Sequence, residues 1–166
     1  MPREAPDAAA AERKVLAARA RELAAPVSRA EDTAGRPFLV LRLGGNRYAL
    51  AAGSVREVFR LAGLTPLPGA EPPVAGLTLW RGRLLTLLDA RRALGLSIDA
   101  LNDLGRVVVL GEGRGAVGLL VDAVEGVEDV PVGALGPPPE GGRLVEGLTR
   151  AGLVVLDAAA VARLNE

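Results

Sequence analysis

Hydrophobic and polar residues alternate in short runs from residue 38 onward, and glycine-rich stretches separate these runs. The apolar segments 38–43 and 106–110 are each followed by a turn containing at least two glycines and then by a second apolar run. Spacing of this kind is typical of β-hairpins in a small barrel or sandwich. The pattern predicts a mainly β body, in which GEGRG at 111–115 is a hairpin turn rather than a phosphate-binding loop, because the run after it is strand-like.

Helical patterns are confined to the beginning of the chain and to two short stretches. Residues 8–25 are rich in good helix formers and end at Pro26, so we expect residues 1–36 to form a helical leader followed by a linker. Alanine-rich stretches follow Asp89 and Asp157. An aspartate in front of such a stretch is a preferred N-cap, so each predicts a short helix, the second being C-terminal.

A series of short segments recurs along the chain in the same order. Residues 48–58 match residues 117–127 at a constant offset of 69. Two later segments recur as well: Gly76-Leu77-Thr78 as Gly147-Leu148-Thr149, and Leu87-Leu88-Asp89 as Val155-Leu156-Asp157. Such self-similarity indicates a duplicated unit, although chance recurrence of apolar residues is the alternative explanation. A unit of about five short strands is small for a core of its own, so we expect two similar lobes packed together.

The composition of the chain argues against several classes of function. Lys+Arg and Asp+Glu are both 20, which argues against a broad nucleic-acid footprint and against a polybasic membrane anchor. Histidine and cysteine are absent, so disulfides and thiolate chemistry are excluded and the commonest acid–base side chain is missing. We therefore expect no catalytic residue, no cofactor and no metal site. No apolar run is long enough to span a bilayer and residues 1–4 lack the apolar core of a signal peptide, so we expect a cytoplasmic protein.

Residues 37–164 resemble the CheW family of chemotaxis coupling proteins. Four stretches carry the resemblance through a V-x-E-V segment, a Gly-x-x-x-x-Arg-Gly hairpin that closes on Asp, a G-x-x-V-D-x-V run and a terminal hairpin with its helix. These stretches are FLVLRLGGNRYALAAGSVREVFR, GLTLWRGRLLTLLDARRALGL, AVGLLVDAVEGVEDV and LVEGLTRAGLVVLDAAAV. Each alone is weak, but their order and spacing together with the duplication are specific.

The resemblance implies two five-stranded, SH3-like β-barrel lobes that are interleaved, with approximate halves at 37–104 and 105–164. It implies a non-catalytic adaptor whose partners are the cytoplasmic tips of methyl-accepting chemoreceptors and the regulatory domain of a CheA-type histidine kinase. It also implies recruitment to membrane receptor arrays without insertion into the membrane. Carried over by motif position, the candidate partner-binding residues are Val55, Glu57, Gly76, Arg81, Gly82, Val121 and Asp122.

Physical arguments give some of these residues two possible roles. Arg81 is expected at a hairpin tip, where its guanidinium either binds a partner carboxylate or pairs within its own lobe. Trp80 either anchors an interface or belongs to the core. Val55 and Glu57 are two residues apart and would share one face of a regular strand, with Val55 either at an interface or in the core and Glu57 either at an interface or solvated.

Two positions depart from the family pattern, Leu79 where the family usually has Asn and Thr86 where it usually has Pro. They leave open an adaptor of a non-flagellar pathway with altered partners. A small nucleic-acid-binding barrel is another alternative, but it would need a basic face and stacking aromatic residues. An enzyme would have to use Asp, Glu, Ser, Arg or Tyr48, and no constellation of such residues is visible.

Overall fold

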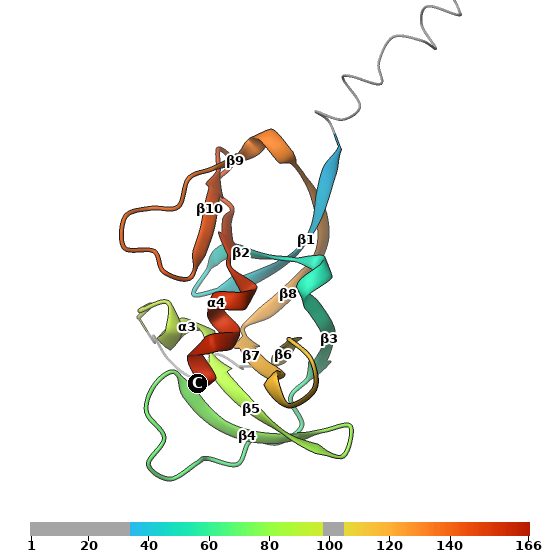
Figure 1. The fold of residues 1–166 in the computed structure, drawn as a ribbon, viewed down its shortest axis with the longest axis vertical. Coiled ribbons are helices and arrows are strands. Elements are labelled where there is room, and N and C mark those ends of the chain that lie inside the picture. The colour runs from blue at the N-terminus through green and yellow to red at the C-terminus, as the bar shows by residue number, and fades with distance from the viewer. Residues whose placement is uncertain (1–33, 98–104) are drawn as a thin grey trace, which may run out of the picture. The chain divides into compact units, whose positions relative to one another are not determined.

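The structure, a computed structural model, describes residues 34–97 and 105–166. These residues form two β-sheets with short helices beside them (Figure 1). The mainly β class that the sequence predicts is confirmed. Residues 1–33 of the predicted leader and linker (1–36) lie outside the described residues, and the end of the predicted linker is already strand, because β1 begins at Gly35.

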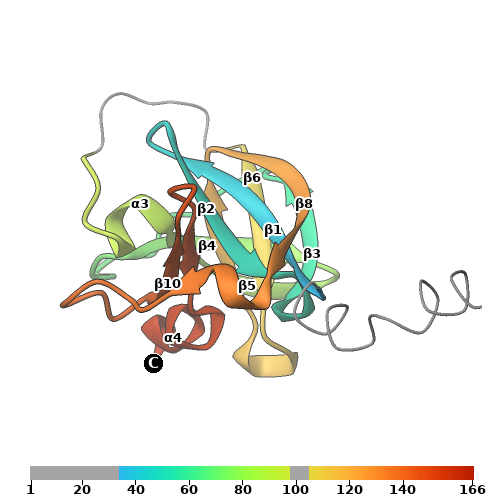
Figure 2. The ribbon, with the colours of Figure 1, turned by 90° about the horizontal axis from the view of Figure 1, so that it is seen from above.

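One sheet contains six strands in the order β8-β1-β2-β11-β10-β9. All neighbours are antiparallel except β2 and β11, which run parallel. Figure 2 shows β1 lying between β2 and β8. The strands are β1 (Gly35–Leu43), β2 (Asn46–Ala51), β8 (Ala123–Pro131), β9 (Leu135–Gly136), β10 (Val145–Thr149) and β11 (Val154–Leu156).

The other sheet contains five strands in the order β3-β6-β7-β5-β4. Here too one pair is parallel, β5 with β7, and the others are antiparallel. The strands are β3 (Val55–Arg60), β4 (Val74–Trp80), β5 (Arg83–Asp89), β6 (Arg106–Leu110) and β7 (Val117–Val121).

Two short α-helices begin where the sequence places them, after Asp89 and Asp157. In each, the aspartate side chain accepts hydrogen bonds from two backbone N–H groups of the first turn. A cap of this kind contributes about 1 kcal/mol, and both predicted helices are confirmed. The helices are α3 (Ala90–Ala93) and α4 (Ala158–Ala162), and the 3₁₀ turns are η1 (Ala52–Ser54), η2 (Gly113–Gly115), η3 (Val132–Ala134) and η4 (Arg163–Asn165). The η2 turn connects β6 to β7, so residues 111–115 are the predicted hairpin connection.

The two sheets are related by the sequence duplication, with their first hairpins exchanged. Hairpin β1–β2 pairs with β8 and β11 of the second copy, whereas hairpin β6–β7 of the second copy pairs with β3 and β5 of the first. The register is also repeated: Val154 lies opposite Tyr48, and the corresponding Thr86 lies opposite Val117. Each sheet therefore requires strands from both copies.

Three apolar clusters fill the body. One cluster belongs to the six-stranded sheet and one to the five-stranded sheet. The largest cluster contains side chains of both sheets, such as Leu41 and Leu50 from one and Leu110 and Leu119 from the other. Alternate residues along each strand thus point into a sheet's own cluster or into the shared one, which joins the two sheets.

The expectation of two closed five-stranded barrels is not confirmed. One sheet has a sixth strand because the two-residue β9 pairs with β10. Among residues 34–97 and 105–166, no ladder of strand pairing joins the two edge strands of either sheet. The sequence pattern distinguishes buried from exposed positions but does not determine whether edge strands pair with each other.

Candidate partner-binding site

The tip of the β4–β5 hairpin presents a group of functional candidates. Trp80 and Arg83 are the last paired residues, and Arg81-Gly82 form the two-residue turn between them. Both turn residues have positive φ, 47° at Arg81 and 75° at Gly82, as the favoured type of two-residue hairpin turn requires. Glycine adopts this conformation without strain, whereas Arg81 is held in it by the hairpin. The predicted position of Arg81 at a hairpin tip is confirmed.

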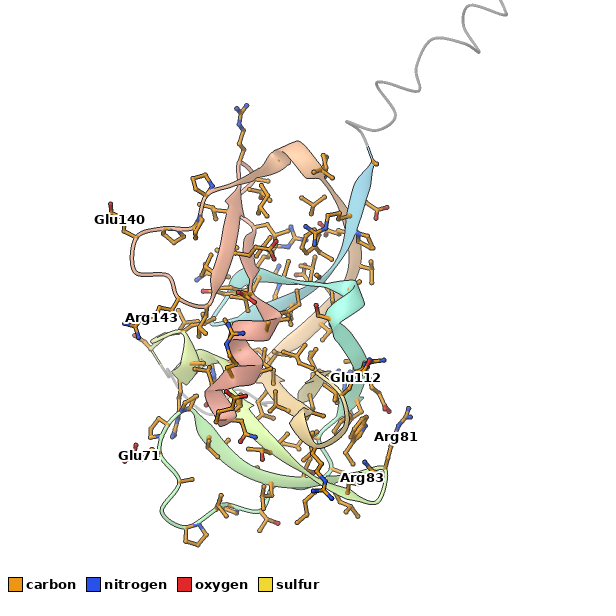
Figure 3. The ribbon with its side chains drawn as sticks, in the orientation of Figure 1. Glu71, Arg81, Arg83, Glu112, Glu140 and Arg143 are labelled. Atoms are coloured by element: carbon orange, nitrogen blue, oxygen red, sulfur yellow. The ribbon has the colours of Figure 1, made fainter. Side chains whose placement is uncertain are left out.

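Glu57 on β3 joins this tip through its carboxylate. Its Oε2 accepts hydrogen bonds from Trp80 Nε1 and from Arg81 Nε, each at 2.9 Å. The Arg81 guanidinium also lies 5.4 Å from the centre of the Trp80 ring, within the range of a cation–π contact. The Arg81 side chain nevertheless remains 71% exposed, and Figure 3 shows it projecting from the hairpin away from the body. Arg81 therefore pairs within its own sheet and is also accessible to a partner.

A β-bulge separates Val55 from Glu57, so the prediction that they share one strand face is wrong. Val55 lies opposite Leu110 and Glu57 opposite Val109, which leaves Arg56 as the extra residue. One inserted residue reverses the alternation of faces. Val55 consequently packs against the shared cluster, while Glu57 faces the side on which Trp80 lies.

Two other candidates lie inside the body. Val121 is fully buried in the shared cluster. Gly76 is buried in β4, where a Cβ atom would come within 2.3 Å of the Thr65 carbonyl oxygen. Its φ of 153° is also one that other residues rarely adopt. These two residues determine the shape of the body, and neither presents a side chain at its surface.

Asp122 lies at the point where the chain passes from the five-stranded to the six-stranded sheet. Its Oδ2 accepts a hydrogen bond of 2.8 Å from the Gly44 N–H in the β1–β2 turn. Its Oδ1 lies 3.7 Å from Nε of Arg91, whose side chain is only 4% exposed and also lies 3.8 Å from Asp89. The contacts of Asp122 thus connect a turn of one sheet to the helix that follows β5 in the other. The sequence interpretation did not single out Arg91, although an arginine two residues after the predicted N-cap Asp89 was a signal for it.

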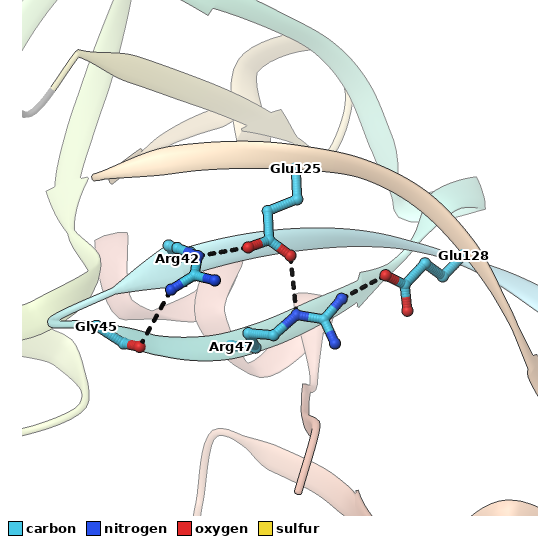
Figure 4. A network of polar contacts seen from close by, with 5 residues as sticks. All are labelled: Arg42, Gly45, Arg47, Glu125 and Glu128. Carbon is cyan, nitrogen blue, oxygen red and sulfur yellow. Dashed lines mark hydrogen bonds and ion pairs between the residues drawn. The ribbon is translucent and has the colours of Figure 1, made fainter. Parts of the chain in front are cut away.

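A second polar network ties the edge strand β8 to hairpin β1–β2 (Figure 4). Glu125, the bulged residue of β8, pairs with Arg42 and Arg47, and Arg47 also pairs with Glu128. Hydrogen bonds donated by Arg42 and then by Arg47 lower the pKa of Glu125. The hydrogen bonds that Arg47 donates to Glu125 and Glu128 raise the pKa of Arg47. The bulges at Glu125 and Arg56 occupy corresponding positions of the two copies. In both copies the bulged residue forms an ion pair, which in the case of Arg56 is with Glu112.

The aromatic side chains do not form a stacking platform. Phe38 and Tyr48 are buried in different apolar clusters, and Phe59 and Trp80 pack against the third. A nucleic-acid-binding barrel would present several aromatic faces to solvent, so the structure gives no support to that alternative. Within the described residues, no group of three acidic side chains could hold a metal ion, and no helix has the length and apolar character needed to cross a membrane.

Comparison with known proteins places the chain in a family. The CheW-like domain family matches residues 37–166. The protein FrzA of Myxococcus xanthus is 34% identical over 63% of this chain, and the chemotaxis protein CheW of Bacillus subtilis is 30% identical over 40%. The matched segments span 66% and 43% of those two relatives.

A solved structure shares the fold. The scaffolding protein TtCheW from Thermoanaerobacter tengcongensis superposes with a TM-score of 0.68, covering 74% of this chain and 89% of that one, at 22% sequence identity. With two sheets, a short C-terminal helix and the family match over residues 37–166, the chain belongs to the CheW-like family.

Proposed function

We propose that this protein is a non-catalytic adaptor that couples chemoreceptors to a CheA-type histidine kinase. It works in the cytoplasm, is recruited to receptor arrays, and binds the receptor's cytoplasmic tip and the kinase's regulatory domain. The single observation that carries the proposal is the Glu57–Trp80–Arg81 cluster in a member of the CheW-like family. The cluster provides a rigid, partly charged surface and no reactive group, as docking requires.

The candidate residues divide into two roles in this proposal. Glu57, Arg81 and Gly82 are accessible and contact the partner directly. The other candidates act through shape, because they are buried, half-buried or bonded within the body: Val55, Gly76, Val121 and Asp122.

Exchanging the charges of Glu57 and Arg81 tests whether the cluster contacts a partner directly or only pairs within the protein. Arg81→Glu and Glu57→Arg are made singly and together in the full chain, and Arg150→Glu in the exposed β10–β11 turn serves as the matched control. Each tagged protein is purified from its native cell, and the recovered receptors and kinase are quantified. We expect both single variants to lose a partner while melting within a few degrees of the parent, because exposed ion pairs contribute little to stability.

The double variant gives the decisive result. Its ion pair is restored with opposite polarity, whereas the hydrogen bond from Trp80 is not, so a purely structural role of the ion pair predicts recovery of partner binding. Direct contact of Arg81 with a partner predicts that binding stays lost. Full recovery, or retention of both partners by Arg81→Glu, would contradict the proposal, as would an equal loss with Arg150→Glu.

One observation favours the more specialised version of this function, an adaptor of a non-flagellar pathway with altered partners. Leu79, which stands where the family usually has Asn, is 69% exposed on β4. A large exposed apolar side chain next to the Arg81 cluster changes which partner surface fits there. Leu79→Asn should then shift the set of receptors that co-purify without changing the melting temperature.

A further inference from the structure

A hollow of about 410 Å³ opens at one end of the five-stranded sheet, beside the two-residue turn of the β4–β5 hairpin. Its apolar lining comes from Trp80, Leu85 and Ala116, which belong to or pack against the apolar cluster of this sheet alone. Its charged lining comes from Arg83 of β5 and Arg114 of the η2 turn. The hollow is therefore the mouth of that cluster, with two guanidinium groups beside an apolar floor.

The register of the sheet places the two arginines side by side. Strands β5 and β7 run parallel with Thr86 opposite Val117, and Arg83 and Arg114 each precede this pair by three residues. Arg83 also lies directly opposite Trp80 in the β4–β5 ladder. Both arginines thus approach the same end of the sheet, next to the tryptophan ring.

The hollow occupies one face of the hairpin. Arg83 and Leu85 are two residues apart on β5, so they share the face on which Trp80 lies. The exposed pair Leu79 and Leu84 forms the adjacent rung of the ladder and faces the other way. Leu84 borders the hollow because it lies between Arg83 and Leu85 in the strand. The two exposed leucines therefore contribute no side chain to this site.

The charges of the hollow are not compensated within the described chain. Arg83 and Arg114 are exposed, and neither forms an ion pair with any residue of 34–97 or 105–166. Figure 3 shows Arg83 near the hairpin tip from which Arg81 projects. The charged residues two positions before them are paired, Arg81 with Glu57 and Glu112 with Arg56. A net charge of two guanidinium groups thus remains at the hollow.

We infer that this hollow binds an acidic loop of a partner protein, with carboxylates on Arg83 and Arg114 and an aliphatic side chain over Trp80 and Leu85. Guanidinium groups bind carboxylates through paired hydrogen bonds, and the tryptophan ring and the leucine give the aliphatic side chain apolar contact. A concave site that combines an apolar lining with a few placed polar groups is the usual form of a side-chain or ligand pocket.

The small number of basic residues favours a protein loop over an anionic membrane. Recruitment by anionic lipids takes a cluster of about four to eight basic residues, whereas two arginines line this hollow. The inference rests on the proposed docking function and specifies the chemistry of one partner surface.

Trp80, the sole tryptophan of the chain, lines the hollow and reports binding there. The purified full-length protein is titrated with a blocked synthetic peptide in which one leucine stands between two glutamates. The comparison ligands are the same peptide with glutamines in place of the glutamates, inorganic phosphate, and vesicles of phosphatidylserine. The variants are Arg83→Gln and Arg114→Gln, singly and together, with Arg150→Gln in the exposed β10–β11 turn as the matched control.

We expect a saturable change of Trp80 emission with the acidic peptide, and at least about tenfold weaker binding both of the glutamine peptide and by the double variant. Each single variant should fall between the parent and the double variant, and Arg150→Gln should bind as the parent does. The charge-reversed protein Arg83→Glu/Arg114→Glu should prefer a peptide with lysines in place of the glutamates, which an unfolded protein would not do.

Four results would overturn the inference. They are equal binding of the acidic and glutamine peptides by the parent, equal weakening by Arg150→Gln and the double variant, no preference of the charge-reversed protein for lysines, and tighter binding of phosphate or vesicles than of the acidic peptide. Because the titrations use purified protein, their outcome is independent of whether receptors and kinase co-purify. Loss of peptide binding with both partners still recovered would refute this inference alone.

Discussion

Replacing Asp122 by alanine tests whether the buried charges between the sheets stabilise the fold. The substitution leaves the Gly44 N–H without its acceptor and removes one of the two carboxylates beside Arg91. Breaking a buried ion pair costs about 3–5 kcal/mol. Because Asp89 still faces Arg91 and the Asp122 side chain is 17% exposed, we expect a loss of about 2–3 kcal/mol in the free energy of unfolding.

Urea denaturation measures this loss, followed both by Trp80 fluorescence and by far-UV circular dichroism. Coincident transitions establish that unfolding is two-state and that the free energies are comparable. Asp129→Ala on β8 is the control, because Asp129 is exposed and forms no ion pair with a described residue, and it should change stability by less than about 0.5 kcal/mol. Asp122→Asn keeps an acceptor for Gly44 and should fall between the two.

Two results would refute this reasoning. The first is a loss for Asp122→Ala no larger than that for Asp129→Ala, which would leave Asp122 as a partner-contact residue only. The second is strict additivity of Arg91→Met and Asp122→Ala, because residues that interact must show a coupling energy in the double variant.

Burial raises the pKa of Tyr48 in the folded protein above its value of about 10 in the unfolded chain. The neutral Tyr48 therefore contributes fully to the free energy of unfolding below about pH 10, and this contribution is lost as the pH rises through the pKa of the folded protein. Tyr48→Phe should therefore lose less free energy of unfolding at high pH than the parent protein, as denaturation at a series of pH values will show. An identical loss at high pH for the two proteins would contradict this expectation. Hydrogen bonds lower the pKa of Glu125, so its contribution is present above about pH 4.3 and is lost as pH falls through the folded value. Glu125→Gln should therefore lose less free energy of unfolding at low pH than the parent protein. An unchanged loss at low pH would argue against the ion-pair network around Glu125. Gly76→Ala should lower the free energy of unfolding by more than about 2 kcal/mol, because of the positive φ of Gly76 and the nearby Thr65 carbonyl oxygen. Gly53→Ala, which has open space around it, should lower it by less than about 0.5 kcal/mol. Thermal melts of both variants will show the difference.

Local features were predictable from the sequence because they depend on neighbouring residues. The caps at Asp89 and Asp157 and the turn at Arg81-Gly82 need only a few adjacent residues, and the structure confirms all three. The recurring segments likewise correspond to strands with repeated register.

Features that depend on distant residues were not predictable in the same way. Alternation identifies the buried positions of β1 and β2 but does not specify which copy supplies their neighbours. The bulge at Arg56 is one unpaired residue without a glycine to mark it, so Glu57 was assigned to the face of Val55. The pairing of Arg91 with Asp122 depends on tertiary contacts between segments far apart in the chain.

The exchange of hairpins has a consequence for how the chain folds during synthesis. Strand β2 obtains its parallel neighbour only when Val154–Leu156 has left the ribosome, since β11 is that neighbour. Until then the outer edge of β2 has no strand partner, and the apolar residues of the first hairpin lack their contacts with Val155 and Leu156. Pairings this distant slow folding and expose strand edges to aggregation, so the nascent protein should depend on chaperones far more than its small size suggests.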